Sequence, residues 1–210
     1  VDQTGVDIVD RPEVNATGAR VVPQRFPRPG RPNARVDLYV QPLDGGARVK
    51  VDLGPDADIY LARVDWSQDG RTLYVQRERR DQKTLDLLAV DQATGQGKVI
   101  LTETSPHWVD LTYDFQPLKT GGFLWSSERT GFRHIYLHGG DGKVVRQVTS
   151  GDWPVDAVEG VDEAAGQVIF SAFRDNPLER RIFTVSYLKP GAPKALTAAG
   201  GLWDVSVAKK

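Results

Sequence analysis

The sequence predicts an all-β protein built from β-propeller blades, each with four antiparallel strands. Strand-like segments recur four times, and a cluster of Gly, Asp or Pro that favours a tight turn follows each one. The second strand of each resulting hairpin closes on a short apolar-polar pair, and these pairs end at residues 52, 102, 149 and 197. Four short strands in a period of about 48 residues are typical of a propeller blade.

The first strand of each hairpin is rich in Val, Ile, Leu and aromatic residues, which suit a pleated and half-buried surface. These strands occupy residues 36–40, 85–90, 134–138 and 182–187. A helix over residues 81–90 is an alternative, because Leu85, Leu88 and Ala89 would share one helical face. We favour a strand, since the same position in the repeat is strand-like in the other three units.

Trp108, Trp153 and Trp203 follow the last three closing pairs, and each opens another apolar stretch that we expect to be the inner strand of a blade. Residues 34–52 are then the outer half of an earlier blade, and residues 202–207 the inner strand of a later one. The three complete blades are predicted to have strands at 59–64, 72–76, 84–90 and 98–102; at 108–112, 123–126, 133–137 and 144–149; and at 155–161, 168–172, 181–187 and 194–197.

Residues 1–33 do not fit the repeat. They are rich in Pro, Gly and Arg, and we expect an irregular arm with one strand near residues 19–25. Five arginines lie between Arg20 and Arg35 without an acid among them, but four prolines in the same stretch favour a solvated loop over an anion site. Position 1 is not Met, so we expect the chain to be part of a larger protein.

Composition excludes several classes of function. The 27 basic and 28 acidic side chains give a net charge of -1, which offers no general attraction to nucleic acid or to anionic membranes. No apolar run is long enough to span a bilayer. The absence of cysteine removes disulfides, thiolate nucleophiles and Cys-based zinc sites.

The sequence contains no recognisable catalytic or metal-binding motif. None of its eight serines has the Gly-x-Ser-x-Gly surroundings of a hydrolase nucleophile, and Ser105 lies near His107 only within a short loop. His134 and His138 have the spacing of a helical zinc pair, but on a strand these positions are about 13 Å apart. We therefore expect no catalytic residue, no metal and no cofactor in this chain.

Three motifs carry a family resemblance. Residues 26–38 resemble the pattern Tyr-Pro-x-x-Gly-x-x-Asn-Pro-x-Val-x-Leu, with Phe26 in place of Tyr and Ala34 in place of Pro. Residues 126–134 are similar to Ser-x-Glu-x-x-Gly-aromatic-Arg-His, and residues 149–155 to Thr-x-Gly-x-Trp-x-Val. In this order the motifs resemble the N-terminal β-propeller of the dipeptidyl peptidase IV family, bacterial type, in the prolyl oligopeptidase clan.

The resemblance implies that the propeller and the catalytic residues belong to separate domains. Members pair an eight-bladed propeller with a C-terminal α/β-hydrolase domain that carries a Ser-Asp-His triad, and they remove N-terminal dipeptides that have Pro or Ala in second place. We expect residues 34–210 to be the non-catalytic half of such a propeller, gating peptide access to the chamber of its own hydrolase domain. The family's paired glutamates, which hold the substrate amine, are expected before Val1. The parent protein is expected to be periplasmic or secreted, with a cytoplasmic location as the alternative.

The resemblance also suggests one binding residue and one interface. Relatives place an aromatic-basic loop of the extended substrate site shortly after the Trp-Val pair that is Trp108-Val109 here. The matching residues are Leu111, Thr112 and Tyr113, of which only Tyr113 is a candidate for substrate binding. Residues 6–33 correspond to an extension used for homodimer contacts, so we expect a homodimer.

Two other classes of function remain open from the sequence. One is a stand-alone interaction propeller of the TolB or WD-repeat type, which would bind partners without catalysis. The other is a carbohydrate-active propeller, for which Asp110, Asp156 and Asp204 would supply acids around a central channel and the tryptophans a stacking surface. Solvation of the propeller rim explains the three aspartates more simply.

Overall fold

The computed structural model describes residues 1–208, which form sixteen strands and no helix. The all-β prediction is therefore confirmed for this part of the chain. None of the described residues forms a helix that could cross a membrane. The strands are β1 Ile8–Asn15, β2 Gly18–Arg25, β3 Tyr39–Val40, β4 Val49–Lys50, β5 Ile59–Trp66, β6 Thr72–Arg79, β7 Thr84–Asp91, β8 Gly97–Thr104, β9 Gln116–Pro117, β10 Phe123–Ser127, β11 His134–His138, β12 Val144–Gln147, β13 Val155–Asp162, β14 Gln167–Ala172, β15 Arg181–Ser186 and β16 Lys194–Ala195.

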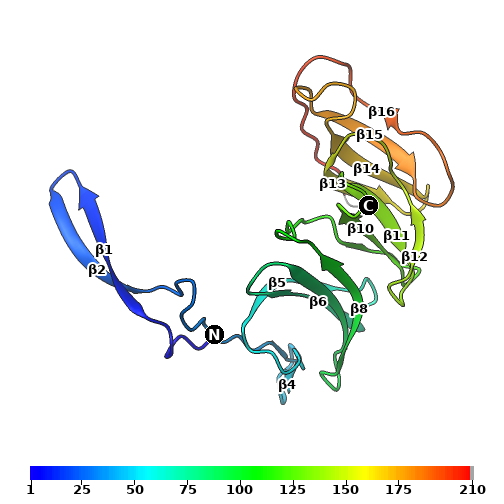
Figure 1. Ribbon diagram of the computed structural model, residues 1–210. Helices are drawn as coiled ribbons and strands as arrows, with labels where there is room; N and C mark the ends of the chain where they lie inside the picture. Colours follow the sequence, from blue (N-terminus) through cyan, green and yellow to red (C-terminus); the bar gives the residue numbers. More distant parts are fainter. Residues whose placement is uncertain (209–210) are drawn as a thin grey trace.

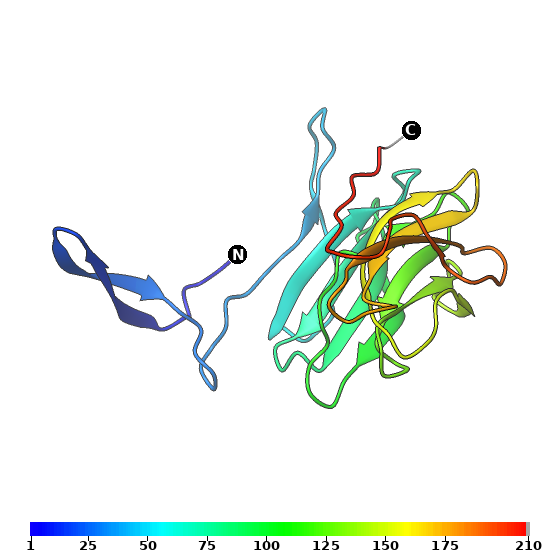
Figure 2. The same ribbon diagram turned by 90° about the horizontal axis from the view of Figure 1, so that it is seen from above.

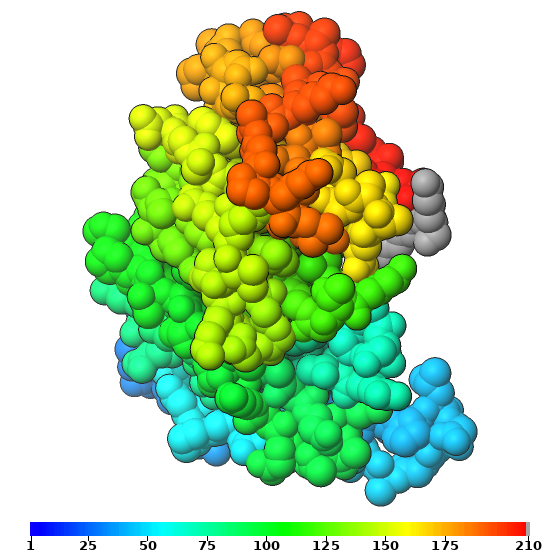
Figure 3. Space-filling model, turned by 90° about the vertical axis from the view of Figure 1, so that its right-hand side faces the viewer, coloured from blue at the N-terminus to red at the C-terminus, as the bar shows by residue number. Residues whose placement is uncertain are grey.

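Twelve of these strands form three four-stranded antiparallel sheets, each in sequence order. We call them blade A (β5–β8), blade B (β9–β12) and blade C (β13–β16). The short pair β3–β4 forms a two-stranded sheet before blade A and corresponds to the expected outer half of an earlier blade. The blades follow one another through space in the order of the sequence (Figures 1 and 3).

The hydrophobic core lies between neighbouring sheets, so blades A and B are buried on both faces. In β6, for example, Leu73 and Val75 face the residues around β3–β4, whereas Tyr74 packs with Phe115 and Phe123 toward blade B. Between blades B and C, Leu124 and Ile135 pack against Phe170 and Phe183. Alternate side chains on a strand point to opposite faces, which explains why these strands are apolar almost throughout.

Two predicted strands are wrong. Residues 108–112 lie in an irregular loop, and the inner strand of blade B is β9, which pairs with Leu124 and Phe123 of β10. Trp108 is 61% exposed and its indole N–H bonds to Asp110, so this tryptophan does not begin a core-facing strand. Residues 202–207 form no strand, because no second strand of the same blade lies beside them within residues 1–208. The alternative helix over residues 81–90 is also wrong, since this segment contains β7.

The N-terminal arm is more regular than expected. The strand expected near residues 19–25 is β2, but it pairs along its whole length with β1, which the sequence pattern did not indicate. The Asn15 carboxamide oxygen accepts hydrogen bonds from the amide and hydroxyl of Thr17, and this closes the turn. The hairpin extends away from the blades (Figures 1 and 2), and Ile8, Val14 and Val21 on it are largely exposed.

At one edge of the molecule, turns from all three blades are joined. The Gln68 side-chain amide donates to the carbonyl of Pro117 at 2.8 Å and to Glu163 Oε1 at 2.5 Å. Glu163 Oε2 accepts the backbone N–H of Lys119 at 2.8 Å. These residues belong to the β5–β6, β9–β10 and β13–β14 segments, so the bonds link blade A to both blade B and blade C. We call this group the three-blade clasp.

Candidate functional site

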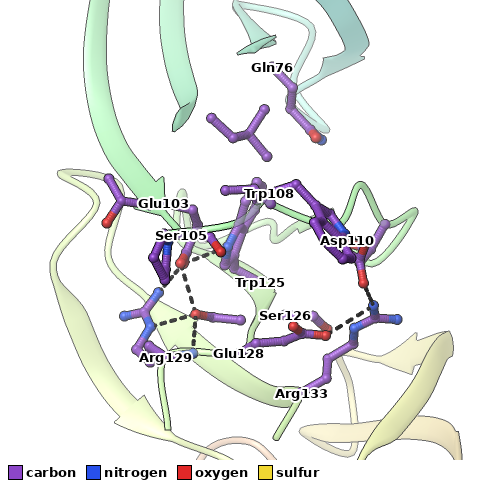
Figure 4. A pocket seen from close by; sticks show the side chains of 16 residues that line it. Gln76, Glu103, Ser105, Trp108, Asp110, Trp125, Ser126, Glu128, Arg129 and Arg133 are labelled. Atoms are coloured by element: carbon purple, nitrogen blue, oxygen red, sulfur yellow. Dashed lines mark hydrogen bonds and ion pairs between the residues drawn. The ribbon is translucent and has the colours of Figure 1, made fainter. Parts of the chain in front are cut away.

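The opposite edge carries the long connection from blade A to blade B, residues 105–115, which we call the connection loop. Beneath this loop lies a cavity of about 300 Å³ between the two blades (Figure 4). Its apolar wall includes Leu85, Trp108 and Trp125, and charged residues from β8, the loop and the β10–β11 turn surround the remainder. We call it the inter-blade pocket.

Glu103 organises one side of the pocket. Its carboxylate accepts hydrogen bonds from the indole N–H of Trp125 at 3.1 Å and from the hydroxyl of Ser127 at 3.0 Å. It also pairs with the guanidinium of Arg129, which in turn lies over the ring of Tyr136 at 4.5 Å. One acid at the end of blade A therefore fixes three side chains of blade B, as Figure 4 shows.

Arg133 organises the other side. Its guanidinium lies 3.5 Å from Asp110 of the connection loop and 3.3 Å from Glu128 of the β10–β11 turn. Asp110 also accepts the indole N–H of Trp108 at 2.9 Å. The Arg133–Asp110 pair thus ties the exposed Trp108 and its loop to blade B (Figure 4).

The connection loop is anchored at its far end by a buried carboxyl group. Asp114 is 2% exposed, and its Oδ1 accepts the backbone N–H of Val158 in blade C at 2.8 Å. Burial raises the pKa of Asp114, while the hydrogen bond from the Val158 amide opposes the rise. The loop is consequently fixed to both blade B and blade C.

Tyr113 lies in the connection loop next to Thr112, which lines the pocket. Its side chain is 79% exposed, and the guanidinium of Arg63 from β5 stacks on its ring at 3.8 Å. This partner could not be predicted from the sequence, because Arg63 is fifty positions away in another blade. Substrate binding by Tyr113 stays a prediction.

The serine and histidines considered in the sequence have structural partners. Ser105 Oγ accepts the backbone N–H of His107 at 3.2 Å and so caps a turn. His134 bonds to Thr149 and to the carbonyl of Gly151, and His138 bonds to the carbonyl of Gly142. Within residues 1–208, no three His, Asp or Glu side chains are grouped as a metal site would require.

The three aspartates of the carbohydrate alternative are each paired with arginine. Asp110 lies beside Arg133, whereas Asp156 and Asp204 both bind Arg180, Asp156 at 2.5 Å. Arg180 also contacts Glu159 at 3.0 Å. These contacts give the aspartates a structural role in linking loops and strands. The two arginines were missed in the sequence, although Arg133 belongs to one of the family motifs.

We expect the protein to lose stability as the pH falls below about 6.5, the ordinary pKa of histidine. Burial lowers the pKa of His134 and His138, although hydrogen bonds to backbone carbonyls partly oppose this. The unfolded chain therefore takes up protons at a higher pH than the folded chain, and stability is lost until the folded-state pKa values are reached. Each unit of pKa difference is worth about 1.4 kcal/mol.

Urea unfolding at pH 7.5 and pH 5.5 measures this loss. The variant His134→Gln should show a smaller difference between the two pH values than the unmodified protein. An equal difference in both proteins would contradict the assignment to His134. The raised pKa of Asp114 acts in the opposite direction, because the folded chain takes up that proton at a higher pH than the unfolded chain.

Comparison with known proteins identifies the family. The family model described as "Dipeptidyl peptidase IV (DPP IV) N-terminal region" matches residues 1–210. The chain belongs to this family. Its resemblance to the dipeptidyl peptidase IV propeller, inferred from three motifs, is thereby confirmed.

Relatives and solved structures agree with the family assignment. The dipeptidyl-aminopeptidase B of Coccidioides posadasii (strain C735) is 32% identical over 178 residues, which cover 77% of this chain and 19% of that protein. The crystal structure of Porphyromonas gingivalis dipeptidyl peptidase 4 superposes with a TM-score of 0.83 at 26% identity, covering 94% of this chain and 28% of that one. The chain thus matches a dipeptidyl peptidase propeller region and spans about a fifth of the length of this curated relative.

Proposed function

We propose that this chain is the non-catalytic propeller portion of a serine exopeptidase that removes X-Pro or X-Ala dipeptides from peptide N-termini. The superposition on Porphyromonas gingivalis dipeptidyl peptidase 4 over 94% of the chain carries the proposal. Under this proposal, the catalytic triad belongs to a C-terminal α/β-hydrolase domain outside residues 1–210. The propeller limits access to the active-site chamber, so that long or folded chains do not reach the nucleophile.

Two features support a substrate-facing role for the edge that carries the connection loop. The loop is anchored on blade B through Arg133 and on blade C through Asp114. Its exposed Trp108 and Tyr113 are therefore held in defined positions. A binding surface benefits from such preorganisation. The homodimer expected from the arm stays a prediction, with the exposed apolar side chains of β1 and β2 in its favour.

The full-length protein is expected to hydrolyse Gly-Pro-p-nitroanilide, whereas the 210-residue chain alone is expected to show no turnover. A second measurement tests gating: the full-length protein should release the dipeptide from a short Ala-Pro peptide but not from a folded protein with an Ala-Pro N-terminus. Turnover by the chain alone, or equal cleavage of the folded protein, would refute the corresponding part of the proposal. A full-length protein without peptidase activity would instead favour an interaction propeller.

A further inference from the structure

A β-bulge controls the direction of Arg63 on the inner strand of blade A. The pairing of β5 with β6 shifts between Leu61, which lies opposite Arg77, and Arg63, which lies opposite Gln76. Ala62 is the additional residue. Because side chains alternate along a strand, an unbroken register would place Arg63 opposite Val75, on the face toward β3–β4. The bulge instead turns it to the face shared by Gln76, toward blade B and the connection loop.

The guanidinium at this position has no carboxylate partner. Within residues 1–208, no acidic oxygen lies within 4.0 Å of this guanidinium, whereas Arg129, Arg133 and Arg180 each form an ion pair. Its one hydrogen bond is from NH1 to the carbonyl of Ala62 at 2.9 Å, and its Nε has no partner in the described residues. A guanidinium has five N–H donors; Nε is buried here, but three of the four donors on NH1 and NH2 have no partner in the described residues and can bind a ligand. Asp65 is the nearest acid along the strand; burial raises its pKa, and the charge of Arg63 opposes the rise.

The ring of Tyr113 restrains this guanidinium. It lies 3.8 Å from the guanidinium carbon, and stacking of this kind restricts the otherwise flexible side chain. A fixed planar guanidinium presents parallel N–H groups, the geometry that carboxylates accept in pairs. The Arg63–Tyr113 pair therefore resembles a receptor for an anion, located beside the inter-blade pocket that Gln76 and Thr112 line.

We propose that Arg63, supported by Tyr113, binds a carboxylate of the peptide substrate beyond the cleaved dipeptide. This rests on the proposed peptidase function and adds a substrate class to it, namely peptides with an acidic group downstream of the cleaved bond. The carboxylate can come from a Glu side chain or from the peptide C-terminus. Both present the same group to Arg63, and the experiment separates them.

The test measures kcat/KM of the full-length protein on Ala-Pro-Gly peptides with Glu or Gln at positions four to six, each as the free acid and as the C-terminal amide. Binding of a side chain predicts about a five- to tenfold preference for Glu in the amide series at one position. Binding of the C-terminus predicts a similar preference for free acids, regardless of Glu or Gln. Either preference should disappear in Arg63→Gln, be reduced in Tyr113→Ala, and be retained in Tyr113→Phe, which keeps the ring.

Arg71→Gln is the matched control, since Arg71 lies in the β5–β6 turn with its side chain 85% exposed. It should leave both preferences unchanged. Arg63→Lys keeps the positive charge but lacks the planar guanidinium, so it should retain only part of the preference. This variant also tests the proposal if Arg63→Gln does not fold.

The outcomes separate the two proposals. Cleavage of Gly-Pro-p-nitroanilide without any preference that depends on Arg63 would overturn the carboxylate site and leave the peptidase function intact. If no X-Pro substrate is cleaved, the peptidase function fails, and titration calorimetry with the same peptides decides the site. Equal affinity of the unmodified protein and Arg63→Gln would then overturn it.

Discussion

Phe170→Ala is expected to lower the free energy of unfolding by about 3–5 kcal/mol, the range for removing a buried aromatic ring from a core. Phe170 in β14 is fully buried and stacks between Trp153, at 6.2 Å between ring centroids, and Phe183, at 5.7 Å. It also belongs to the cluster that joins blades B and C. Urea denaturation followed by tryptophan fluorescence measures the change.

Val145→Ala is the control, since Val145 lies on the outer strand of blade B and is 64% exposed. It should change the free energy of unfolding by less than about 0.5 kcal/mol. A loss below about 1 kcal/mol for Phe170→Ala would show that the two sheets do not depend on this aromatic stack.

Arg77→Met is expected to cost about 3–5 kcal/mol, because it leaves a buried carboxylate without its cation. Arg77 in β6 pairs with Asp86 in β7 at 2.6 Å, and the two side chains are only 18% and 15% exposed. The same guanidinium donates to the carbonyl of Leu53, so its loss also weakens the contact between blade A and the segment after β4. Chemical denaturation gives the change in stability.

The double variant Arg77→Met/Asp86→Leu distinguishes an unpaired charge from a loss of packing. It should recover most of the stability, since removing both charges avoids burying one alone. Some loss should persist, because Asp86 also accepts the hydroxyl of Thr102 at 2.6 Å. A double variant as unstable as Arg77→Met would attribute the effect to packing and to the Leu53 contact.

Blades A and C could be predicted from the sequence nearly strand by strand, because their hairpins repeat at nearly constant spacing and their central strands are rich in buried apolar residues. The inner strand of blade B could not. Its residues Gln116 and Pro117 are few and polar or conformationally restricted, whereas the apolar run at Trp108 matched the repeat. Tertiary pairing with β10 decides the strand position here, and local pattern does not reveal it.

The residues of the candidate site were harder to predict than the fold. The motif around Arg133 marked the family, but its bond to Asp110 depends on how two blades pack. The orientation of Arg63 depends on one unpaired residue in β5, and a bulge has no distinct sequence signature in a strand of Leu, Ala and Arg. Sequence periodicity therefore located the strands, whereas the contacts between blades became evident only in three dimensions.

The three-blade clasp has a consequence for how sequences of this kind can diverge. Gln68 and Glu163 are almost a hundred positions apart, yet each satisfies the other across the intervening blade. A mutation at either position removes the direct bond between blades A and C and leaves the other residue bound only to blade B, so a compensating change is favoured at the other. Residues 68 and 163 should therefore be inherited as a matched pair among homologues, even though they belong to blades that are not neighbours in the ring.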